Sequence, residues 1–457
     1  MYNTRQSPFI PSSSSKKVRC SQVQAHPYLS ADALFKLVRQ AFEKVPEHRV
    51  MNVEIPLDDA LMSGFAMFSL KDPSLLAFDN RRERPENLQR IYHIRHIPSD
   101  TQMRTILDQV PPKHLRPVFK QVFGTLHQQK VLRRLCFMDR YYLVSLDGTG
   151  YFSSKKVHCD QCLERQNSRT GEITYAHQLL GGAIIHPDHA EVVPLCPEPI
   201  IKQDGTKKND CERNAAKRFL AHLREDYPHI PFIIVEDALS ANAPHIRELQ
   251  RHKLHFILGV KPGDHAHLFD YVAQAHVRGD TTEFERQVAG VTQRFRYLNN
   301  VPLNASNPDV LVNFLEYWEI QGDQVQHFTW ITDFVITQDN ASTLMRGGRA
   351  RWKIENETYN TLKNQGYHFE HNFGHGHRYL SVIFALLMML AFAVDQAQQL
   401  ACSLFQAAWH KVGSRCGLWE RMRALFYTLP FTAMADIWRA IAFGFHIQGQ
   451  VILHDTS

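Results

Sequence analysis

The chain has 457 residues, of which 44% are hydrophobic, and its formal net charge is +6 at pH 7. This length predicts two or three domains, and the charge is compatible with nucleic-acid binding without being specific for it. Eight unevenly spaced cysteines argue against a small disulfide-rich secreted protein and favour a reducing compartment. No signal peptide is evident, and the longest apolar run, 379–394, is shorter than the ~20 residues of a membrane span. We therefore expect a soluble intracellular protein without a membrane partner.

The N-terminal part of the chain combines a polar leader with a helical pattern. Residues 1–25 contain a serine run followed by basic residues, which predicts a disordered basic leader. From Ser30 apolar residues recur at helical spacing, so we expect 26–135 to form a helical module. Within it, the segment 80–96 combines Tyr92 with several arginines, which is either a solvated face or a contact for phosphates. These arginines are Arg81, Arg82, Arg84, Arg90 and Arg95.

A buried strand is predicted next, at 141–152, because aromatic and branched residues dominate it. Asp147 interrupts this apolar pattern and is followed by two glycines that permit close approach of another group. Taken alone, such an aspartate is more often a turn-capping residue at a strand end, and the alternative is a metal ligand. Two further strand-like runs, 176–185 and 190–196, are joined by a short turn, which indicates an antiparallel meander.

Helix and strand then alternate. Residues 211 to about 225 form a predicted helix, with Asn209 and Glu212 as a possible capping box. The apolar run 231–237 indicates a fully buried parallel strand that ends in Asp237. The remaining elements of this part are a short helix at 244–252 and a strand at 254–260.

The order of these elements predicts an α/β fold. Three strands, a helix, a strand, a helix and a strand make up an RNase H-like mixed sheet. In that arrangement the first and fourth strands are neighbours. The fold would therefore bring Asp147 and Asp237 together at one edge of the sheet.

The region after residue 260 breaks this rhythm. Strand-like runs make 262–338 a predicted β-rich insertion, with strands at 293–298, 311–320 and 327–335. A helical stretch begins at Asn340 and ends near Asn364, and the pair Gly347-Gly348 is expected to kink or divide it. A segment rich in glycine and histidine covers 366–377. We expect one α/β domain over 136–400 and a helical region over 401–457.

Glu355 lies on the helical stretch and completes a set of three carboxylates with Asp147 and Asp237. Phosphoryl transfer uses two divalent cations about 3.5–4 Å apart, at the attacking and leaving oxygens. Mg²⁺ prefers carboxylate oxygens, and Mn²⁺ suits the same ligands. The three carboxylates beside a basic helix therefore predict a site for two Mg²⁺ ions, for which Mn²⁺ can substitute.

Around these residues the chain resembles bacterial insertion-sequence transposases of the DDE class, in the group that carries a β-strand insertion before the glutamate. The matching segments are 145–149, 235–238, 351–357, 361–364 and 370–376. The resemblance, which covers roughly 90–400, implies that Asp147, Asp237 and Glu355 are catalytic metal ligands. It implies cleavage of DNA at the ends of the element, followed by transfer of the freed 3′-hydroxyl to target DNA or to the opposite strand. Terminal inverted repeats, target DNA and a second copy of the chain are the implied partners, in the bacterial cytoplasm at the nucleoid.

This group carries a Tyr-Arg-Glu-Lys signature with gaps of two, three and six residues. Arg351 and Glu355 keep the three-residue gap, which favours Glu355 over Glu357 as the metal ligand. Gly348 stands at the tyrosine position, and the lysine gap is seven residues long. The basic residues that we expect to contact phosphate are Arg349, Arg351, Lys353 and Lys363.

Tryptophans of the insertion are a further expectation from the resemblance. Hairpin-forming relatives stack such a tryptophan on a flipped base, an interaction worth about 1–3 kcal/mol. Trp330 or Trp318 could do so here, and ordinary core packing is the alternative for each.

Two cysteines have the spacing of half a zinc site. His158, Cys159 and Cys162 are the proposed ligands, with His177 as the nearest addition, and a reduced-thiol loop is the alternative. The glycine- and histidine-rich segment offers further ligands, although contacts to DNA or to the helix suit its position better. Its histidines are His371, His375 and His377.

We therefore expect a DDE transposase whose helical N-terminal module, 26–135, binds the ends of its own element. A metal-dependent nuclease without joining activity and an inactive DNA-binding derivative are the alternatives.

Overall fold

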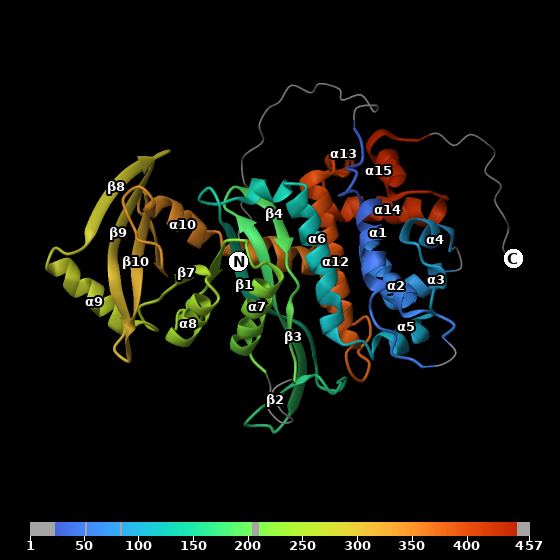
Figure 1. The fold of residues 1–457 in the computed structure, drawn as a ribbon, viewed down its shortest axis with the longest axis horizontal. Helices are drawn as coiled ribbons and strands as arrows, with labels where there is room; N and C mark the ends of the chain where they lie inside the picture. The colour runs from blue at the N-terminus through green and yellow to red at the C-terminus, as the bar shows by residue number, and fades with distance from the viewer. Residues whose placement is uncertain (1–22, 51–52, 83–84, 203–209, 446–457) are drawn as a thin grey trace.

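The computed structural model describes residues 23–50, 53–82, 85–202 and 210–445. Over these residues an eleven-stranded mixed sheet runs through the molecule, with helices packed around it and a helical body at one end (Figure 1). The predicted α/β class and the helical N- and C-terminal regions are confirmed. Most of the predicted leader, 1–25, lies outside the described residues, as do Arg84 and Asn209.

Strand β1 (Tyr142–Ser154) is the centre of the first half of the sheet. It pairs antiparallel with β3 (Ile173–His186) and parallel with β6 (Phe232–Glu236). The pairing of β1 with β6 makes the first and fourth predicted strands neighbours, as expected. Strand β6 in turn pairs parallel with β7 (His255–Gly259). Three shorter strands pair with β3, namely β2 (Leu163–Gln166), β4 (His189–Pro194) and β5 (Glu198–Ile200).

The predicted β-rich insertion continues this sheet. Its strands β8 to β11 pair antiparallel in sequence order, and β11 pairs antiparallel with β7. The sheet therefore passes from the first half into the insertion without a break (Figure 1). The bounds are β8 (Thr282–Val288), β9 (Val291–Asn304), β10 (Asn307–Gln321) and β11 (Gln324–Thr332), and helix α9 (Ala266–Val277) precedes them.

The parallel centre of the sheet is covered on its faces. All five residues of β6, Phe-Ile-Ile-Val-Glu, are buried, which is the pattern of a parallel strand packed on both sides. Helix α7 (Glu212–Asp226) contacts β3 and β5, α8 (Ala243–Arg251) contacts β7, and α10 (Ala341–Arg349) contacts β6 and β7.

Helix α12 (Leu380–Ala401) organises the helical body. It contacts helices from the beginning and from the end of the described chain, so the two helical regions pack around one element. Its length and composition would suffice to cross a membrane, but its most apolar window is entirely buried inside the protein. The other helices here are α1 (Ala31–Phe42), α2 (Leu57–Ser69), α3 (Leu75–Arg81), α4 (Glu86–Tyr92), α5 (Asp100–Leu107), α6 (Arg116–Gln128), α13 (Ser403–Val412), α14 (Arg415–Thr428) and α15 (Met434–Phe443).

A buried ion pair joins the two helical regions. The ammonium of Lys71, just after α2, contacts the carboxylate of Asp395 on α12, and the Lys71 side chain is fully buried. The hydroxyl of Tyr367 donates to Asp395 at 2.6 Å, and the Lys71 ammonium lies 4.2 Å from the ring centre of Trp419. Both charges therefore have several partners, which a buried pair requires.

The helical stretch predicted over 340–364 is divided. Helix α10 ends at Arg349, directly after the glycine pair, and the chain resumes as a π-helical turn, η4 (Ile354–Tyr359). A short helix, α11 (Asn360–Asn364), completes the stretch. Side chains at Gly347 and Gly348 would collide with Phe137 and Trp330, so the glycines permit close packing of α10.

Candidate active site and candidate metal centre

The parallel pairing of β1 with β6 positions the two aspartates. The paired residues run from Tyr142 opposite Phe232 to Ser145 opposite Val235. Continued by two residues, the same register puts Asp147 opposite Asp237, which directly follows β6. Residues opposite each other in neighbouring strands project from the same face of the sheet. The sequence folds this way because each strand contains a mostly apolar run that is followed by an aspartate, although β1 itself continues to Ser154.

The electrostatics of Asp147 show that the carboxylates converge. Burial raises the pKa of Asp147 to about 6, and the negative charge of Glu355 adds to this effect. Arg351 acts in the opposite direction, whereas Glu212 and Asp237 raise the pKa further. The other two predicted carboxylates, Asp237 and Glu355, therefore lie within electrostatic reach of Asp147, together with a fourth, Glu212.

Glu212 is the fourth carboxylate, and its position beside Asp147 and Asp237 was not predicted from the sequence. It is the first residue of α7, and the N-cap, Cys211, makes no side-chain capping bond. A Cβ at Gly148 would lie 2.3 Å from the Glu212 carboxylate, so this glycine lets Glu212 lie directly over β1. Burial raises the pKa of Glu212, and Asp237 raises it further. Gly148 beside Asp147 was the only local signal of this approach.

A cavity of about 730 Å³ opens in front of these groups. Asp147, Asp237 and Glu212 line it, with Arg165 and Lys217 among the basic side chains. One oxygen of Asp237 accepts a hydrogen bond from the backbone nitrogen of Leu239 at 3.0 Å. The donor set fits Mg²⁺, because hard divalent cations prefer carboxylate oxygens and would offset the like charges that raise the pKa of Asp147.

Glu355 is fixed to the sheet by its neighbours on the divided helix. Arg351 forms an ion pair with Glu355 at 2.9 Å, and the Arg351 carbonyl accepts a hydrogen bond from Ser145 Oγ at 3.2 Å. The hydroxyl of Tyr359 donates to the Asp147 carbonyl and accepts from the Gly181 nitrogen. Glu355 therefore lies in a π-helical turn that is anchored to β1 and β3, and such turns are frequent at functional sites.

The other predicted phosphate contacts point elsewhere. Lys363 forms an ion pair with Glu370 at 2.8 Å, and Lys353 donates to the His189 carbonyl at 2.7 Å. Arg349 contacts the Glu319 carboxylate and lies over the ring of Phe328. Among the predicted basic residues of the described chain, Arg351 is the one that reaches the carboxylate group, through its ion pair with Glu355 and its charge beside Asp147.

Trp330 and Trp318 differ in their surroundings. Trp330 is 6% exposed, and its indole fills the space beside Gly348 that a side chain would need. Trp318 is half-buried, stacks on His327, and carries the guanidinium groups of two arginines over its ring, Arg294 and Arg296. Core packing therefore accounts for Trp330 in this structure.

The arginine run of the N-terminal module is partly engaged within the protein. Arg81 contacts Asp72 and lies over the ring of Tyr427, and Arg82 pairs with Asp79 at 2.6 Å. Tyr92 is fully buried and is not available for stacking on a base.

A second group of metal-binding side chains is buried apart from the carboxylate group. It consists of Cys159 and Cys162 between β1 and β2, His177 on β3, and His375 in the segment after α11. This Cys2His2 group could hold a metal ion such as zinc, because its ligand atoms all lie within 4.8 Å of one another. The expected ligand His158 is not part of it. His158 is exposed, its Nδ1 lies 3.1 Å from the Lys156 carbonyl, and its ring stacks on Tyr175.

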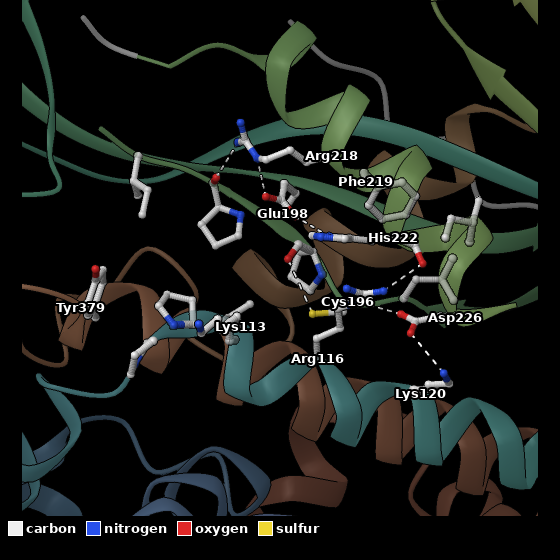
Figure 2. A pocket seen from close by; sticks show the side chains of 18 of the residues that line it. Lys113, Arg116, Lys120, Cys196, Glu198, Arg218, Phe219, His222, Asp226 and Tyr379 are labelled. Carbon is white, nitrogen blue, oxygen red and sulfur yellow. Dashed lines mark hydrogen bonds and ion pairs between the residues drawn. The ribbon is translucent and has the colours of Figure 1, made fainter. Parts of the chain in front are cut away.

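A further cavity, of about 760 Å³, lies between α6, α7 and β5. Figure 2 shows its charged side chains in mutual contact: Arg116 reaches Asp226 at 2.7 Å, and Arg218 reaches Glu198 at 2.6 Å. His222 adds a contact to Glu198 at 3.3 Å. The cavity holds paired opposite charges, whereas like charges gather around Asp147.

Comparisons with protein-family models and with curated proteins found no match for this chain.

Proposed function

We propose that the chain is a DDE transposase with an RNase H-like catalytic domain, which cleaves and joins DNA at the ends of its own insertion sequence. The observation that carries this proposal is the convergence of three carboxylates: Asp147 and Asp237, from two adjacent strands, line one cavity, and the charge of Glu355 acts on Asp147. The pairing of β1, antiparallel with β3 and parallel with β6, supports the RNase H-like part.

The roles of the residues follow from their chemistry. Asp147, Asp237 and Glu355 would hold two Mg²⁺ ions, which supply charge neutralisation at the attacking and leaving oxygens of the phosphodiester. Arg351 positions Glu355 through their ion pair and keeps a guanidinium beside the carboxylates, where a phosphate can share it. Terminal inverted repeats and target DNA are the proposed partners, bound by a homodimer in the bacterial cytoplasm.

The test uses the full chain and a labelled duplex that carries the terminal sequence of its own element, beside a scrambled duplex. In Mg²⁺ we expect cleavage at the element boundary and joining of the freed 3′ end to a target plasmid. Asp237→Asn should reduce the cleavage rate at least about 1,000-fold while DNA binding persists. The substitution removes a negative charge beside the reacting phosphate and leaves the rest of the DNA-binding surface unchanged.

The matched control is Glu357→Gln, in the same helical turn as Glu355, which should leave cleavage close to wild type. Cleavage without joining would favour a nuclease that uses the same carboxylates. Specific binding without cleavage, in Mg²⁺ and in Mn²⁺, would contradict the proposal and favour the inactive DNA-binding derivative.

A further inference from the structure

We infer that Cys159, Cys162, His177 and His375 bind one Zn²⁺ ion in a closed, four-coordinate structural site. This site is separate from the carboxylates of the proposed transposase reaction and does not depend on that function. The ion would join the turn between β1 and β2 and strand β3 to the segment that follows α11.

The distances between the ligand atoms match a tetrahedron. With Zn–S near 2.3 Å and Zn–N near 2.05 Å, a tetrahedral site has about 3.8 Å between two sulfurs, about 3.6 Å between sulfur and nitrogen, and about 3.3 Å between two nitrogens. The two cysteine sulfurs lie 3.8 Å apart. The Nε2 atom of His177 lies 3.3 Å from Cys159 Sγ and 3.4 Å from Cys162 Sγ, and the Nε2 atom of His375 lies 3.1 Å from Cys162 Sγ. The atoms therefore stand near the corners that a zinc ion requires, and slightly inside them.

The polar atoms of the two imidazoles point to the same conclusion. His177 is 0% exposed and His375 is 7% exposed, and their Nδ1 atoms have no hydrogen-bond partner among the described residues. The buried rings thus direct their other nitrogen, Nε2, at the sulfurs. Coordination through Nε2 would leave the ring proton on Nδ1, and the bond to the metal would offset part of the cost of burying each imidazole.

The charges and the burial favour a structural ion over a catalytic one. Two thiolates and two neutral imidazoles balance the charge of Zn²⁺, so the complete centre can be buried without a net charge. All four ligands are at most 7% exposed, and four protein ligands complete the tetrahedron. No coordination position remains for water or substrate, which distinguishes a structural zinc site from a catalytic one.

The segment that His375 belongs to is held in place by side-chain packing and hydrogen bonds of loop residues, because it has no regular secondary structure of its own. Between α11 and α12 the described chain forms no helix or strand, and glycines at 366, 374 and 376 take positive φ angles. The Asp160 nitrogen donates to the His377 carbonyl at 2.9 Å, and the Asp108 carboxylate accepts from the nitrogens of His377 and Arg378. A zinc ion would add a strong crosslink between this segment and the sheet, directly after the helix that carries Glu355.

The full chain is purified without chelator and without a metal-affinity column. Its zinc content is then measured by inductively coupled plasma mass spectrometry. We expect one zinc per chain, which Cys162→Ser and His375→Asn should each reduce to less than a tenth. Two matched controls should keep the wild-type content: His158→Ala, beside the cysteines, and Cys416→Ser, an exposed cysteine.

A second measurement covers the case in which the variants fail to fold. Wild-type protein stripped of zinc and refilled with Co²⁺ should show the visible absorption of a tetrahedral cobalt site with thiolate ligands. Absence of both bound zinc and this spectrum would overturn the inference. So would a disulfide between Cys159 and Cys162, detected as two missing thiols in the native protein, or full zinc content in His375→Asn.

Discussion

The carboxylate group around Asp147 and the Cys2His2 group around Cys162 differ in charge balance and in exposure to solvent, although each draws on the β1–β3 region. Each includes at least one residue of the β1–β3 region, such as Asp147 or His177, and one residue from beyond residue 350, Glu355 or His375. The carboxylate group collects like charges at the edge of a cavity of about 730 Å³, whereas the Cys2His2 group collects donors that are buried from solvent. An open site of unbalanced charge suits an exchangeable ligand, and a closed site of balanced charge suits a permanent one.

The largest contrast is expected between stability effects at the two sites in the absence of added Mg²⁺. Cys162→Ser should lower the free energy of unfolding by several kcal/mol, because a structural zinc contributes its binding energy to folding. Asp147→Asn should instead leave stability unchanged or raise it slightly, because it removes a carboxylate whose pKa is raised by burial and by Glu355. Denaturant unfolding of both variants measures this, and equal losses would abolish the distinction between the two sites.

The buried pair of Lys71 and Asp395 is a third arrangement, in which opposite charges neutralise each other without a metal. Lys71→Met should destabilise the protein by about 3–5 kcal/mol, because it leaves an unpaired buried carboxylate. The double variant Lys71→Met with Asp395→Leu should recover most of this loss. A double variant as unstable as the single one would mean that the pair itself, rather than the orphaned charge, matters.

Glu212 tests whether the fourth carboxylate belongs to the proposed metal site. Glu212→Gln should raise the Mg²⁺ concentration needed for half-maximal cleavage about 10-fold, because it removes one negative charge beside Asp237. Glu225→Gln, on the exposed end of the same helix, is the control. An unchanged Mg²⁺ requirement would assign Glu212 to the fold alone.

The smallest expected effect concerns the pair of His245 and Glu236, next to Asp237. Burial lowers the pKa of His245, but the Glu236 carboxylate, 2.6 Å away, outweighs this and raises it above its ordinary value. The resulting stabilisation is complete below about pH 6.5 and is lost as the pH rises through the raised pKa. Wild-type Tm should therefore fall by about 1–3 °C over that range relative to His245→Gln. If Tm falls equally with pH in the two proteins, the pair of His245 and Glu236 does not contribute to stability.

The apolar runs of the sequence predicted the strands of the central sheet. They did not predict the polar strands, or the contacts between residues far apart in the chain. Strands at 141–152 and 231–237 could be predicted because burial on both faces requires continuous apolar residues. Strands β2 and β8 were missed because most of their residues are exposed and show no apolar pattern. Strand β5 has three residues, which is too short for any periodicity.

The candidate sites show the same limit. The spacing of Cys159 and Cys162 indicated half of a metal site, and the adjacent His158 was the wrong choice to extend it. His375 comes from far along the chain, and only the tertiary fold brings it to the cysteines. Glu212 looked like a capping residue because local sequence does not reveal which strand a helix end approaches.

The contact between Trp330 and Gly348 makes these two positions dependent on each other in evolution. A Cβ at residue 348 would lie 2.4 Å from the indole nitrogen, so even alanine requires the tryptophan to move. A tyrosine, the first residue of the Tyr-Arg-Glu-Lys signature, cannot fit at 348 while Trp330 keeps its place. In a library randomised at both positions, tyrosine at 348 should be recovered only together with a smaller residue at 330, so each substitution is tolerated or rejected according to the other.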